Sequence, residues 1–457
     1  MFFKQYKVQG LGCYSYMIGC PAEATACVVD PERHIQQYID DAESNGLKIT
    51  AIFDTHIHAD HITGSAELAC ATGAPIYISH EADVKYPHND LSEGDIFKFG
   101  SAELRVLETP GHTPNSVSFV ITDLSRSADP FGILTGDLLF VGDIGRPDLA
   151  GENLLTQQVK NLYESLYIKL AKFPDWIEVY PAHGQGSLCG KGMSSKPMTT
   201  LGFERRNNKL LNNMPYNEFH KIMTSNFQTR PDNFITIVDK NSAGPKLIRQ
   251  AEKFRPLTNN QTQREIDAGA TLVDVRNQTS FGSAFIDSSI NIGLSPNSVN
   301  WLGMFVPAEQ SIVIIANSAQ EAHEANHIFK RAGYDNIVGY VSDGLTSWAS
   351  QARPLNHLPQ LTVEGVKRVL EKYPDHVVID VRSEDEFHAD HIEAAINIPA
   401  TTLVGQPIDI PKDKYITVVC ASGYRSNIAG SFLKSQGYQH VYSLIGGMTA
   451  WKNFDRH

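Results

Sequence analysis

The stretch that decides the fold of this chain is Asp54-Thr55-His56-Ile57-His58-Ala59-Asp60-His61. It follows directly on the apolar run from Ile49 to Phe53, a pattern that predicts a strand ending in this loop. Three imidazoles and a carboxylate thus stand close together at HxHxDH spacing. Histidines also cap turns and line surfaces, but four candidate ligands at the end of a rigid strand favour a metal site.

Three later segments repeat the same local pattern, an apolar strand followed by a Gly or Pro turn and one ligand-type side chain. They place His112 in Thr109–Pro114, Asp137 at the end of Leu134–Asp137, and His183 in Tyr180–Gly184. Taken singly, each could be a structural histidine or a turn cap. Because separate strand ends can converge on one edge of a sheet, the set together predicts a site with several metal ligands.

The composition sets bounds on the class of protein. The chain has 457 residues, enough for about three domains, and 42% of them are hydrophobic. A net charge of -12, from 39 basic and 51 acidic residues, argues against a nucleic-acid surface. No apolar run approaches the roughly 18 residues of a membrane span, and Met1–Tyr6 lacks a signal-peptide core, so we expect a cytoplasmic protein without a membrane partner.

The second half of the chain contains an internal repeat. Four segments recur in order at an offset of 103 to 106 residues: Leu272–Arg276 as Val378–Arg382, Ser289–Ile292 as Ala395–Ile398, Gly333-Tyr334 as Gly437-Tyr438, and Asp343–Trp348 as Gly446–Trp451. Each copy alternates β-branched runs with amphipathic stretches such as Ala319–Ala332 and Ser426–Ser435. This pattern predicts two copies of a parallel α/β domain.

These features divide the chain into three predicted domains. Residues 1–255 hold the ligand-bearing segments, with a charge-rich extension and linker from about residue 191. Residues 256–355 and 356–457 hold the two copies of the repeat.

Over roughly residues 1–190, the ligand segments resemble the metallo-β-lactamase superfamily. The resemblance implies an αββα sandwich with metals at one edge of its sheets. By the family pattern His56, His58, His112 and Asp137 form one site, and Asp60, His61 and His183 form a second with Asp137 bridging. Two zinc ions there would make a hydrolase that attacks a thioester or related carbonyl.

The segments Thr135–Phe140 and Gly145–Leu149 look like the persulfide dioxygenase branch of that superfamily. The resemblance implies one Fe(II) per chain, held by His56, His112 and Asp137, with coordination sites left open for O₂ and a sulfur anion. His58, Asp60, His61 and His183 would then orient the ligands. Asp148 would hydrogen-bond near them beside Arg146, unless the two form a plain surface salt bridge.

The second copy of the repeat carries a cysteine loop in Ile416–Ser426. An apolar strand runs into Cys420, and Ala421, Ser422, Gly423, Tyr424 and Arg425 lead into a helix. Loop N–H groups, the helix dipole and Arg425 can stabilise a persulfide anion on the sulfur. Residues 357–457 resemble a rhodanese domain, which implies that Cys420 carries sulfane sulfur.

The first copy aligns Ala316 with Cys420 and lacks both the Gly and the Arg of the loop, so we predict an inactive rhodanese-like domain. Cys189 follows His183 by six positions and is a candidate catalytic thiol facing the metal pocket, although a small buried loop residue is equally compatible. A role for Cys20 is left open in the same way. Cys13, Cys27 and Cys70 have apolar or small neighbours and are predicted to be core residues.

The whole chain resembles the bacterial fused persulfide dioxygenase–sulfurtransferases. The resemblance implies O₂-dependent oxidation of a glutathione, coenzyme A, bacillithiol or cysteine persulfide to sulfite, and then thiosulfate formation at Cys420, for sulfide detoxification. A homo-oligomer is expected, because an inactive copy beside an active one is a natural assembly surface. The alternatives are a binuclear zinc thioesterase of the glyoxalase II type, with two Zn ions, and a non-enzymatic sulfur-relay or sensing protein.

Overall fold

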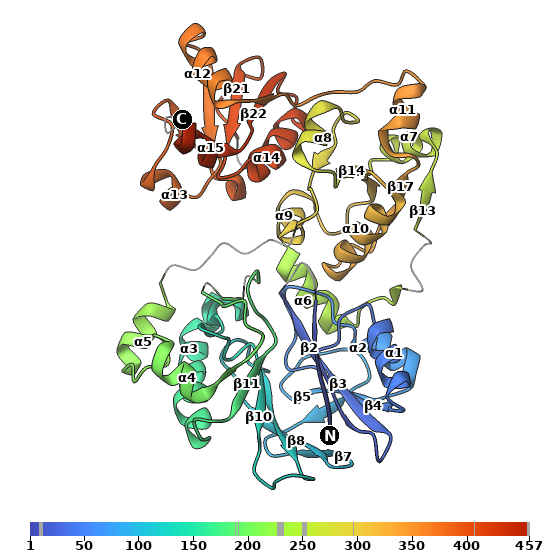
Figure 1. The fold of residues 1–457 in the computed structure, drawn as a ribbon, viewed down its shortest axis with the longest axis vertical. Helices are drawn as coiled ribbons and strands as arrows, with labels where there is room; N and C mark the ends of the chain where they lie inside the picture. The colour runs from blue at the N-terminus through green and yellow to red at the C-terminus, as the bar shows by residue number, and fades with distance from the viewer. Residues whose placement is uncertain are drawn as a thin grey trace. The chain divides into compact units, whose positions relative to one another are not determined.

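The computed structural model describes residues 1–8, 12–187, 189–190, 192–225, 233–248, 254–295, 297–405 and 407–454. The chain divides into two compact units (Figure 1). One contains residues 1–251 together with 330–333, and the other contains residues 252–329 together with 334–457. No helix in the described ranges is both long enough and apolar enough to cross a bilayer.

The first unit is built on two six-stranded sheets. One sheet has the order β1-β2-β3-β4-β5-β6, with strands Phe2–Lys7, Tyr14–Cys20, Thr25–Val29, Lys48–Phe53, Ile76–Ser79 and Asn89–Leu91. The other has the order β12-β11-β10-β9-β8-β7, with strands Thr199–Thr200, Glu178–Pro181, Gly132–Gly136, Val117–Asp123, Ala102–Glu108 and Ile96–Phe99.

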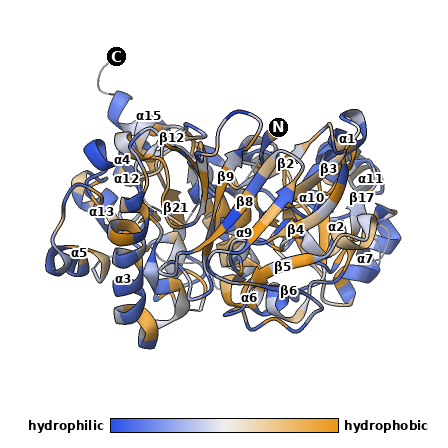
Figure 2. Cartoon of the chain, turned by 90° about the horizontal axis from the view of Figure 1, so that it is seen from below, coloured by the Kyte–Doolittle hydropathy of each residue, from blue (hydrophilic) through white to orange (hydrophobic). Residues whose placement is uncertain are grey.

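The core of this unit lies in three apolar layers. Phe53 of β4 and Phe119 of β9 pack between the two sheets, with ring centroids 5.2 Å apart. The outer face of the first sheet is covered by α1 (Gln36–Ser44) and α2 (Ser65–Thr72). The outer face of the second is covered by α3 (Leu155–Glu164) and α5 (Tyr216–Met223). The predicted αββα sandwich is therefore confirmed, and Figure 2 shows strand β5 as hydrophobic and helix α1 as largely hydrophilic.

This unit also contains the α-helices α4 (Leu201–Asn207) and α6 (Asn233–Ala243). The segment after Arg146 forms the 3-10 turn Pro147–Ala150.

The second unit contains two five-stranded sheets whose neighbouring strands pair in parallel. The first sheet has the order β13-β17-β16-β14-β15, with strands Arg255–Leu257, Ile337–Val341, Ile312–Ile315, Thr271–Asp274 and Ile290–Asn291. Its helices are α7 (Asn259–Asp267), α8 (Gln278–Ser283), α9 (Ser298–Phe305), α10 (Ala319–Arg331) and α11 (Gly344–Ser350). Strand β13 begins at Arg255, one residue before the predicted boundary.

The second sheet has the same topology, β18-β22-β21-β19-β20, with strands Gln360–Leu361, His440–Leu444, Tyr415–Val419, Val377–Asp380 and Ala395–Asn397. Its helices are α12 (Val363–Lys372), α13 (Glu384–Ala389), α14 (Tyr424–Ser435) and α15 (Gly447–Phe454). The sequence repeat is thus a structural repeat, and the expectation of two parallel α/β domains is confirmed.

Candidate metal centre and thiol loop

Three loops that follow strands bring together His56, His112 and Asp137, and we call these residues the triad. His56 follows β4, His112 lies between β8 and β9, and Asp137 follows β10. All three are at most 2% exposed, and their donor atoms lie within 4.8 Å of one another. Asp137 Oδ2 is 3.3 Å from His112 Nε2 and 3.9 Å from His56 Nε2.

The opposite ring nitrogen of each triad histidine is already engaged. His112 Nδ1 donates to the carbonyl oxygen of Arg146 at 2.9 Å. Thr55 Oγ1 donates to Asp30 Oδ2 and therefore accepts from His56 Nδ1, both at 2.9 Å. This network assigns the tautomers and leaves both Nε2 atoms as free electron-pair donors toward Asp137.

The electrostatics of the triad favour a cation. Burial, and then the neighbouring His58, lower the pKa of His56 well below its usual value, and burial lowers that of His112. Burial alone would raise the pKa of Asp137, but the charges of His183 and His112 outweigh it and hold this pKa low. Asp137 Oδ2 is buried without a hydrogen-bond partner, a costly state that a metal ion bound by the two Nε2 atoms would relieve. The residues present therefore fit a metal.

His58 lies beside the triad but is held by a different carboxylate. Its ring centroid is 4.3 Å from that of His56, and its Nε2 is 3.2 Å from Asp30 Oδ1. His58 groups with Asp30 and Asp54 rather than with the triad, and its Nδ1 is a buried atom without a hydrogen-bond partner. Asp30 was missed in the sequence, although it follows strand β3 in the same way as the other ligand-type residues follow their strands.

His183 connects the triad to a second group of side chains. Its Nδ1 is 2.5 Å from Asp137 Oδ1, and its Nε2 is 2.8 Å from Asp60 Oδ2. His61 Nδ1 lies 3.0 Å from Asp60 Oδ1. Burial opposes a charge on His183, but the two carboxylates raise its pKa well above the usual value.

Among the described residues, Asp148 is connected to the triad through Arg146. Its carboxylate accepts two hydrogen bonds of 2.7 Å from the Arg146 guanidinium, and the Arg146 carbonyl in turn accepts from His112. Arg146 is buried, with 7% of its surface exposed, so its ion pair with Asp148 is not a plain surface salt bridge.

The cysteines of the first unit fall into different surroundings. Cys189 is buried with its sulfur within 4.8 Å of donor atoms of Asp137 and His183, and burial, then the Asp137 charge, raise its thiol pKa to about 12. Cys27 lies in the core as predicted, whereas Cys70 is exposed, which corrects its predicted burial. The Cys13 sulfur contacts Asp60 and His61 and does not lie among apolar side chains as predicted. Nothing in its local sequence distinguishes it, because His183 and Asp60 reach it from distant segments.

The thiol loop forms a backbone cradle around Cys420. Gly423 N donates to Cys420 Sγ at 3.1 Å, and the thiol is 3.6 Å from Ser426 Oγ. Gly423 has φ +101°, which glycine adopts without the strain that a side chain would bring. Ala421 and Ser422 complete the turn, and Thr449 Oγ1 donates to Ala421 O at 2.9 Å.

Arg425 of this loop is paired with a residue that the sequence analysis missed. Its guanidinium donates two hydrogen bonds of 2.7 Å to the carboxylate of Glu386. Glu386 also closes the capping box of α13 with Ser383, and this S-x-x-E pattern is the signal that could have marked it as fixed in place. The positive charge expected near Cys420 is therefore partly neutralised.

Tyr424 ties the loop to the first copy of the repeat. Its hydroxyl donates to Gly293 O at 2.7 Å and accepts from Ser295 Oγ at 3.1 Å. The loop that presents Cys420 is thus anchored from outside its own domain.

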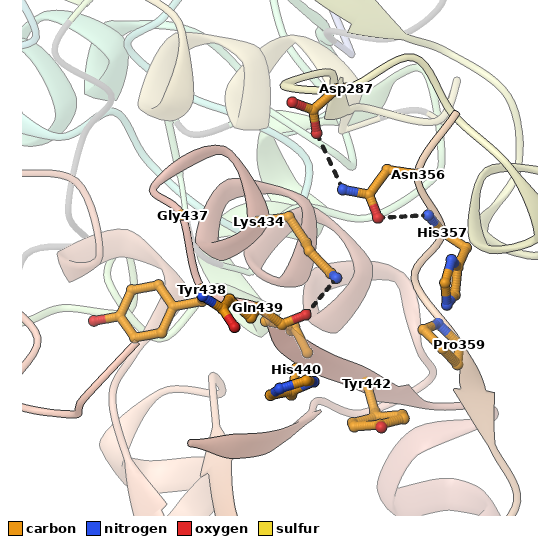
Figure 3. A pocket seen from close by; sticks show the side chains of 11 residues that line it. Asp287, Asn356, His357, Pro359, Lys434, Gly437, Tyr438, Gln439, His440 and Tyr442 are labelled. Atoms are coloured by element: carbon orange, nitrogen blue, oxygen red, sulfur yellow. Dashed lines mark hydrogen bonds between the residues drawn. The ribbon is translucent and has the colours of Figure 1, made fainter. Parts of the chain in front are cut away.

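Figure 3 shows a cavity of about 480 Å³ that is lined by Lys434, near the C-terminal end of α14, whereas Cys420 precedes the start of this helix. The helix has 12 residues and is about 18 Å long, so this cavity is separate from the thiol loop. Two pairs of its lining residues are hydrogen-bonded to each other, since Asn356 donates to Asp287 and Lys434 donates to Gln439 O.

Comparison with known proteins agrees with this architecture. The metallo-beta-lactamase superfamily model matches residues 9–183, and the rhodanese-like domain model matches residues 258–351 and 362–454. A solved metallo-beta-lactamase from Staphylococcus aureus subsp. aureus COL is 32% identical with a TM-score of 0.67, over 75% of this chain and 98% of that one. The chain therefore belongs to the metallo-β-lactamase superfamily and carries two rhodanese-like domains.

Within this superfamily the N-terminal region is homologous to persulfide dioxygenases. Mitochondrial persulfide dioxygenase ETHE1 of Mus musculus is 32% identical over 216 residues, which are 46% of this chain and 75% of the relative. Hydroxyacylglutathione hydrolase of Polaromonas sp. is 33% identical over 173 residues, which are 37% of this chain and 61% of that relative. The persulfide dioxygenase relative and the rhodanese-like domains support an enzyme of the dioxygenase and sulfurtransferase kinds, while a hydrolase matches at similar identity.

Proposed function

We propose that this protein oxidises low-molecular-weight persulfides with O₂ to sulfite at a mononuclear Fe(II) site, and that it then forms thiosulfate at Cys420. In the first reaction a persulfide, O₂ and water give the free thiol, sulfite and two protons. The observation that carries the proposal is that one chain joins a buried two-histidine, one-carboxylate triad to a cysteine loop shaped for sulfane sulfur.

His56, His112 and Asp137 would hold the iron, which when bound supplies the redox chemistry that joins O₂ to the terminal sulfur. The surrounding residues fix this set. Arg146 O and Thr55 Oγ1 hold the two histidine Nδ1 protons, and His183 holds Asp137 Oδ1. All three triad side chains are buried, so packing limits their motion.

Cys420 would carry out the transfer. Its thiolate attacks the terminal sulfur of a second persulfide, the S–S bond of that persulfide breaks, and the free thiol leaves with the proton. The Gly423 N–H and the N-terminus of α14 stabilise the resulting anionic sulfur. Sulfite then attacks this sulfur, thiosulfate leaves, and the electron pair of the broken bond returns to Cys420.

The remaining roles are proposals of the same kind. Glutathione, coenzyme A, bacillithiol and cysteine are the carrier thiols to be compared, and Cys189 is a candidate for sulfur exchange beside the triad. His58, Asp60, His61 and Asp148 would orient ligands, and the cytoplasmic location and the homo-oligomer remain predictions of the sequence.

The test is oxygen consumption by Fe(II)-loaded full-length protein supplied with glutathione persulfide, then with the other carriers. Wild type and Cys420→Ser should both consume O₂, with sulfite accumulating in the variant and thiosulfate in wild type. Exposed Cys70→Ser is the matched control and should behave as wild type. Absence of O₂ uptake with every carrier would contradict the dioxygenase step.

A second candidate function is a binuclear zinc thioester hydrolase with attached rhodanese domains. It is favoured by the hydroxyacylglutathione hydrolase relatives and by the presence of all seven ligand residues of the two-metal pattern. It predicts cleavage of a glutathione thioester by zinc-loaded protein without O₂. Thioester cleavage together with no O₂ uptake by the iron-loaded form would select this function instead.

A further inference from the structure

The cavity of Figure 3 lies in the second unit, away from the thiol loop. Its volume of about 480 Å³ is in the range of pockets that hold small organic ligands. One wall comes from Asp287 of the first copy and from Asn356 and His357 of the segment that joins the copies. Most of the rest comes from the segment that leads from the end of α14 into β22. Because β22 begins here and Cys420 follows the end of its parallel neighbour β21, a ligand in the cavity lies at the opposite edge of the sheet from the thiol.

The wall from the first copy is fixed by hydrogen bonds. Asn356 forms an antiparallel bridge with Phe285, in which the two N–H groups donate to the opposite carbonyls at 2.8 and 2.9 Å. The Asn356 side chain donates to Asp287 Oδ1 at 3.0 Å and accepts from His357 N at 2.8 Å. The Asp287 carboxylate is thus engaged by an amide, and this wall is formed before any ligand binds.

The floor of the cavity is aromatic. His440 and Tyr442 alternate with buried Val441 along β22, so their rings lie on the same face of the sheet. The His440 ring stacks on Tyr415 with centroids 4.2 Å apart and an interplanar angle of 5°, and the Tyr442 ring lies at 15° to Tyr415. Figure 3 shows the rings of His440 and Tyr442 below the ammonium group of Lys434. Nearly parallel rings offer a flat surface on which a planar ligand group can stack.

The first copy of the repeat has no such floor. The positions of the three rings are held there by Ser311, Asn336 and Gly339. The corresponding strands form the same parallel sheet without aromatic side chains at these positions. The aromatic floor of the second copy is therefore not a requirement of the fold.

The sides of the cavity carry positive charge. Lys434 Nζ donates to Gln439 O at 2.7 Å, and Lys412 Nζ donates to another backbone carbonyl at 2.6 Å beside Gly437 of the lining. Both acceptors are neutral, and within the described ranges neither ammonium group forms an ion pair. Partial burial lowers the pKa of Lys434, against the charge of Asp287, so an anionic partner would stabilise its ammonium group.

We propose that this cavity binds a small organic phosphate with a planar ring, of the size of a nucleoside monophosphate. The ring stacks on His440 and Tyr442, and the phosphate lies against Lys434 with Lys412 at the rim. Ammonium groups act as point charges that suit a phosphate dianion. The His357 imidazole and the Tyr442 hydroxyl have no hydrogen-bond partner among the described residues, and both can donate to the ligand.

This site goes beyond the proposed function, because neither persulfide oxidation nor sulfur transfer uses it. Its walls come from both copies of the repeat, so a bound ligand connects the wall at Asn356 to strand β22. Binding should therefore stabilise the folded second unit.

The test is equilibrium dialysis of metal-free full-length protein with AMP, adenosine or inorganic phosphate. Wild type should bind one AMP per chain, about tenfold or more tighter than either fragment, because the ring and the phosphate use different walls. No binding of AMP below about 1 mM, or equal affinity for either fragment, overturns the proposal.

Two variants separate the contributions of the floor and the side. Lys434→Met should weaken AMP binding about tenfold or more and leave adenosine binding unchanged, since it removes a charged donor. Tyr442→Ala should weaken the binding of both AMP and adenosine. Lys452→Met is the matched control, because Lys452 pairs with Asp390 outside the cavity, and Cys420→Ser tests the thiol loop as the anion site. Unchanged AMP affinity in Lys434→Met, or loss of binding in Cys420→Ser, overturns the proposal.

Thermal unfolding followed by circular dichroism checks folding and gives a second readout. AMP should raise the Tm of wild type and leave that of Lys434→Met unchanged, and an equal rise in both overturns the site. If Tyr442→Ala does not fold, Tyr442→Leu replaces it, because leucine keeps apolar bulk without a ring. These measurements need no turnover, so a failure of O₂ uptake leaves them unaffected.

Discussion

The two rhodanese-like copies share one supporting network and differ in the loop it supports. In the first copy Asp274 accepts from Arg276, and in the second Asp380 accepts from Arg382, with Nε–Oδ1 distances of 2.9 and 3.0 Å. The next strand of each copy supplies an asparagine whose side-chain amide donates to the backbone carbonyls of both the Asp and the Arg. The two bonds from Asn291 measure 2.8 and 2.9 Å, and both bonds from Asn397 measure 2.9 Å. Both copies therefore keep this network, whether or not a cysteine follows in the loop.

At the loop itself the two copies use their backbone groups differently. In the second copy Gly423 N donates to the Cys420 sulfur. In the first copy Ala316 replaces the cysteine, and Asn317 N donates at 2.6 Å to the carboxylate of Glu321, which aligns with Arg425. The loop of the first copy thus binds a carboxylate of its own, where the loop of the second copy offers an N–H donor to sulfur.

The first copy also supports the second. Asn427 of α14 donates to Asn291 Oδ1 at 2.6 Å, and Ser431 Oγ accepts from Asn291 N at 2.9 Å. Together with the bond from Tyr424 to Gly293, these contacts hold the helix that begins at the thiol loop. The comparison teaches that a copy without the cysteine can still help to position its partner's loop.

The largest expected effect comes from moving the nucleophile between copies. Cys420→Ala should reduce thiosulfate formation by about a thousandfold or more, as loss of a covalent nucleophile does. Adding Ala316→Cys should restore nothing, because Glu321 repels a sulfur anion and no Gly or Arg follows. Thiosulfate production by the two variants is the measurement, and recovery in the double variant would show that the loops are equivalent.

The matched asparagines sharpen the comparison of the two networks. Asn291→Ala should lower the free energy of unfolding by about 1–3 kcal/mol, because it leaves two buried carbonyls and the Asn427 amide without a partner. Asn397→Ala removes the same two carbonyl bonds and should cost less. Urea unfolding of both variants tests this, and an equal or greater loss for Asn397→Ala would contradict support across the copies.

Tyr424→Phe should have a smaller effect. Loss of the hydroxyl that reaches Gly293 O removes about 0.5–1.5 kcal/mol of anchoring, and thiosulfate formation should slow about threefold to tenfold. Tyr438→Phe is the control, because its hydroxyl bonds Ile408 O within the second copy. The rate ratio of the two variants is measured, and equal rates would refute the anchoring role.

The smallest effect concerns the ion pair that only the second copy has. The hydrogen bonds from Arg425 lower the pKa of Glu386 from 4.5 to about 2. The lowered folded-state pKa means that the stabilisation is present above pH 4.5 and is lost as pH falls toward 2. Because Glu386 is 38% exposed, the pair contributes less than about 1 kcal/mol. Unfolding of wild type and Glu386→Gln should converge over this pH range, and a constant difference would exclude the pair.

The sequence by itself determined the elements that are local or repeated. Strand-then-ligand patterns marked His56, His112 and Asp137, and the ordered matches near Asp274 and Asp380 revealed the repeat. Spacing and hydrophobic periodicity encode these features because each depends on only a few adjacent residues. The loop around Cys420 could be recognised for the same reason.

Only the tertiary structure decided which distant side chains meet. It brought Cys13 to Asp60, paired Glu386 with Arg425, and set His183 between two carboxylates. Such contacts join loops separated by tens to more than a hundred residues, and their partners are chosen by the packing of whole sheets. A cysteine among apolar neighbours reads as core in the sequence, because nothing local records which carboxylate the fold will place against it.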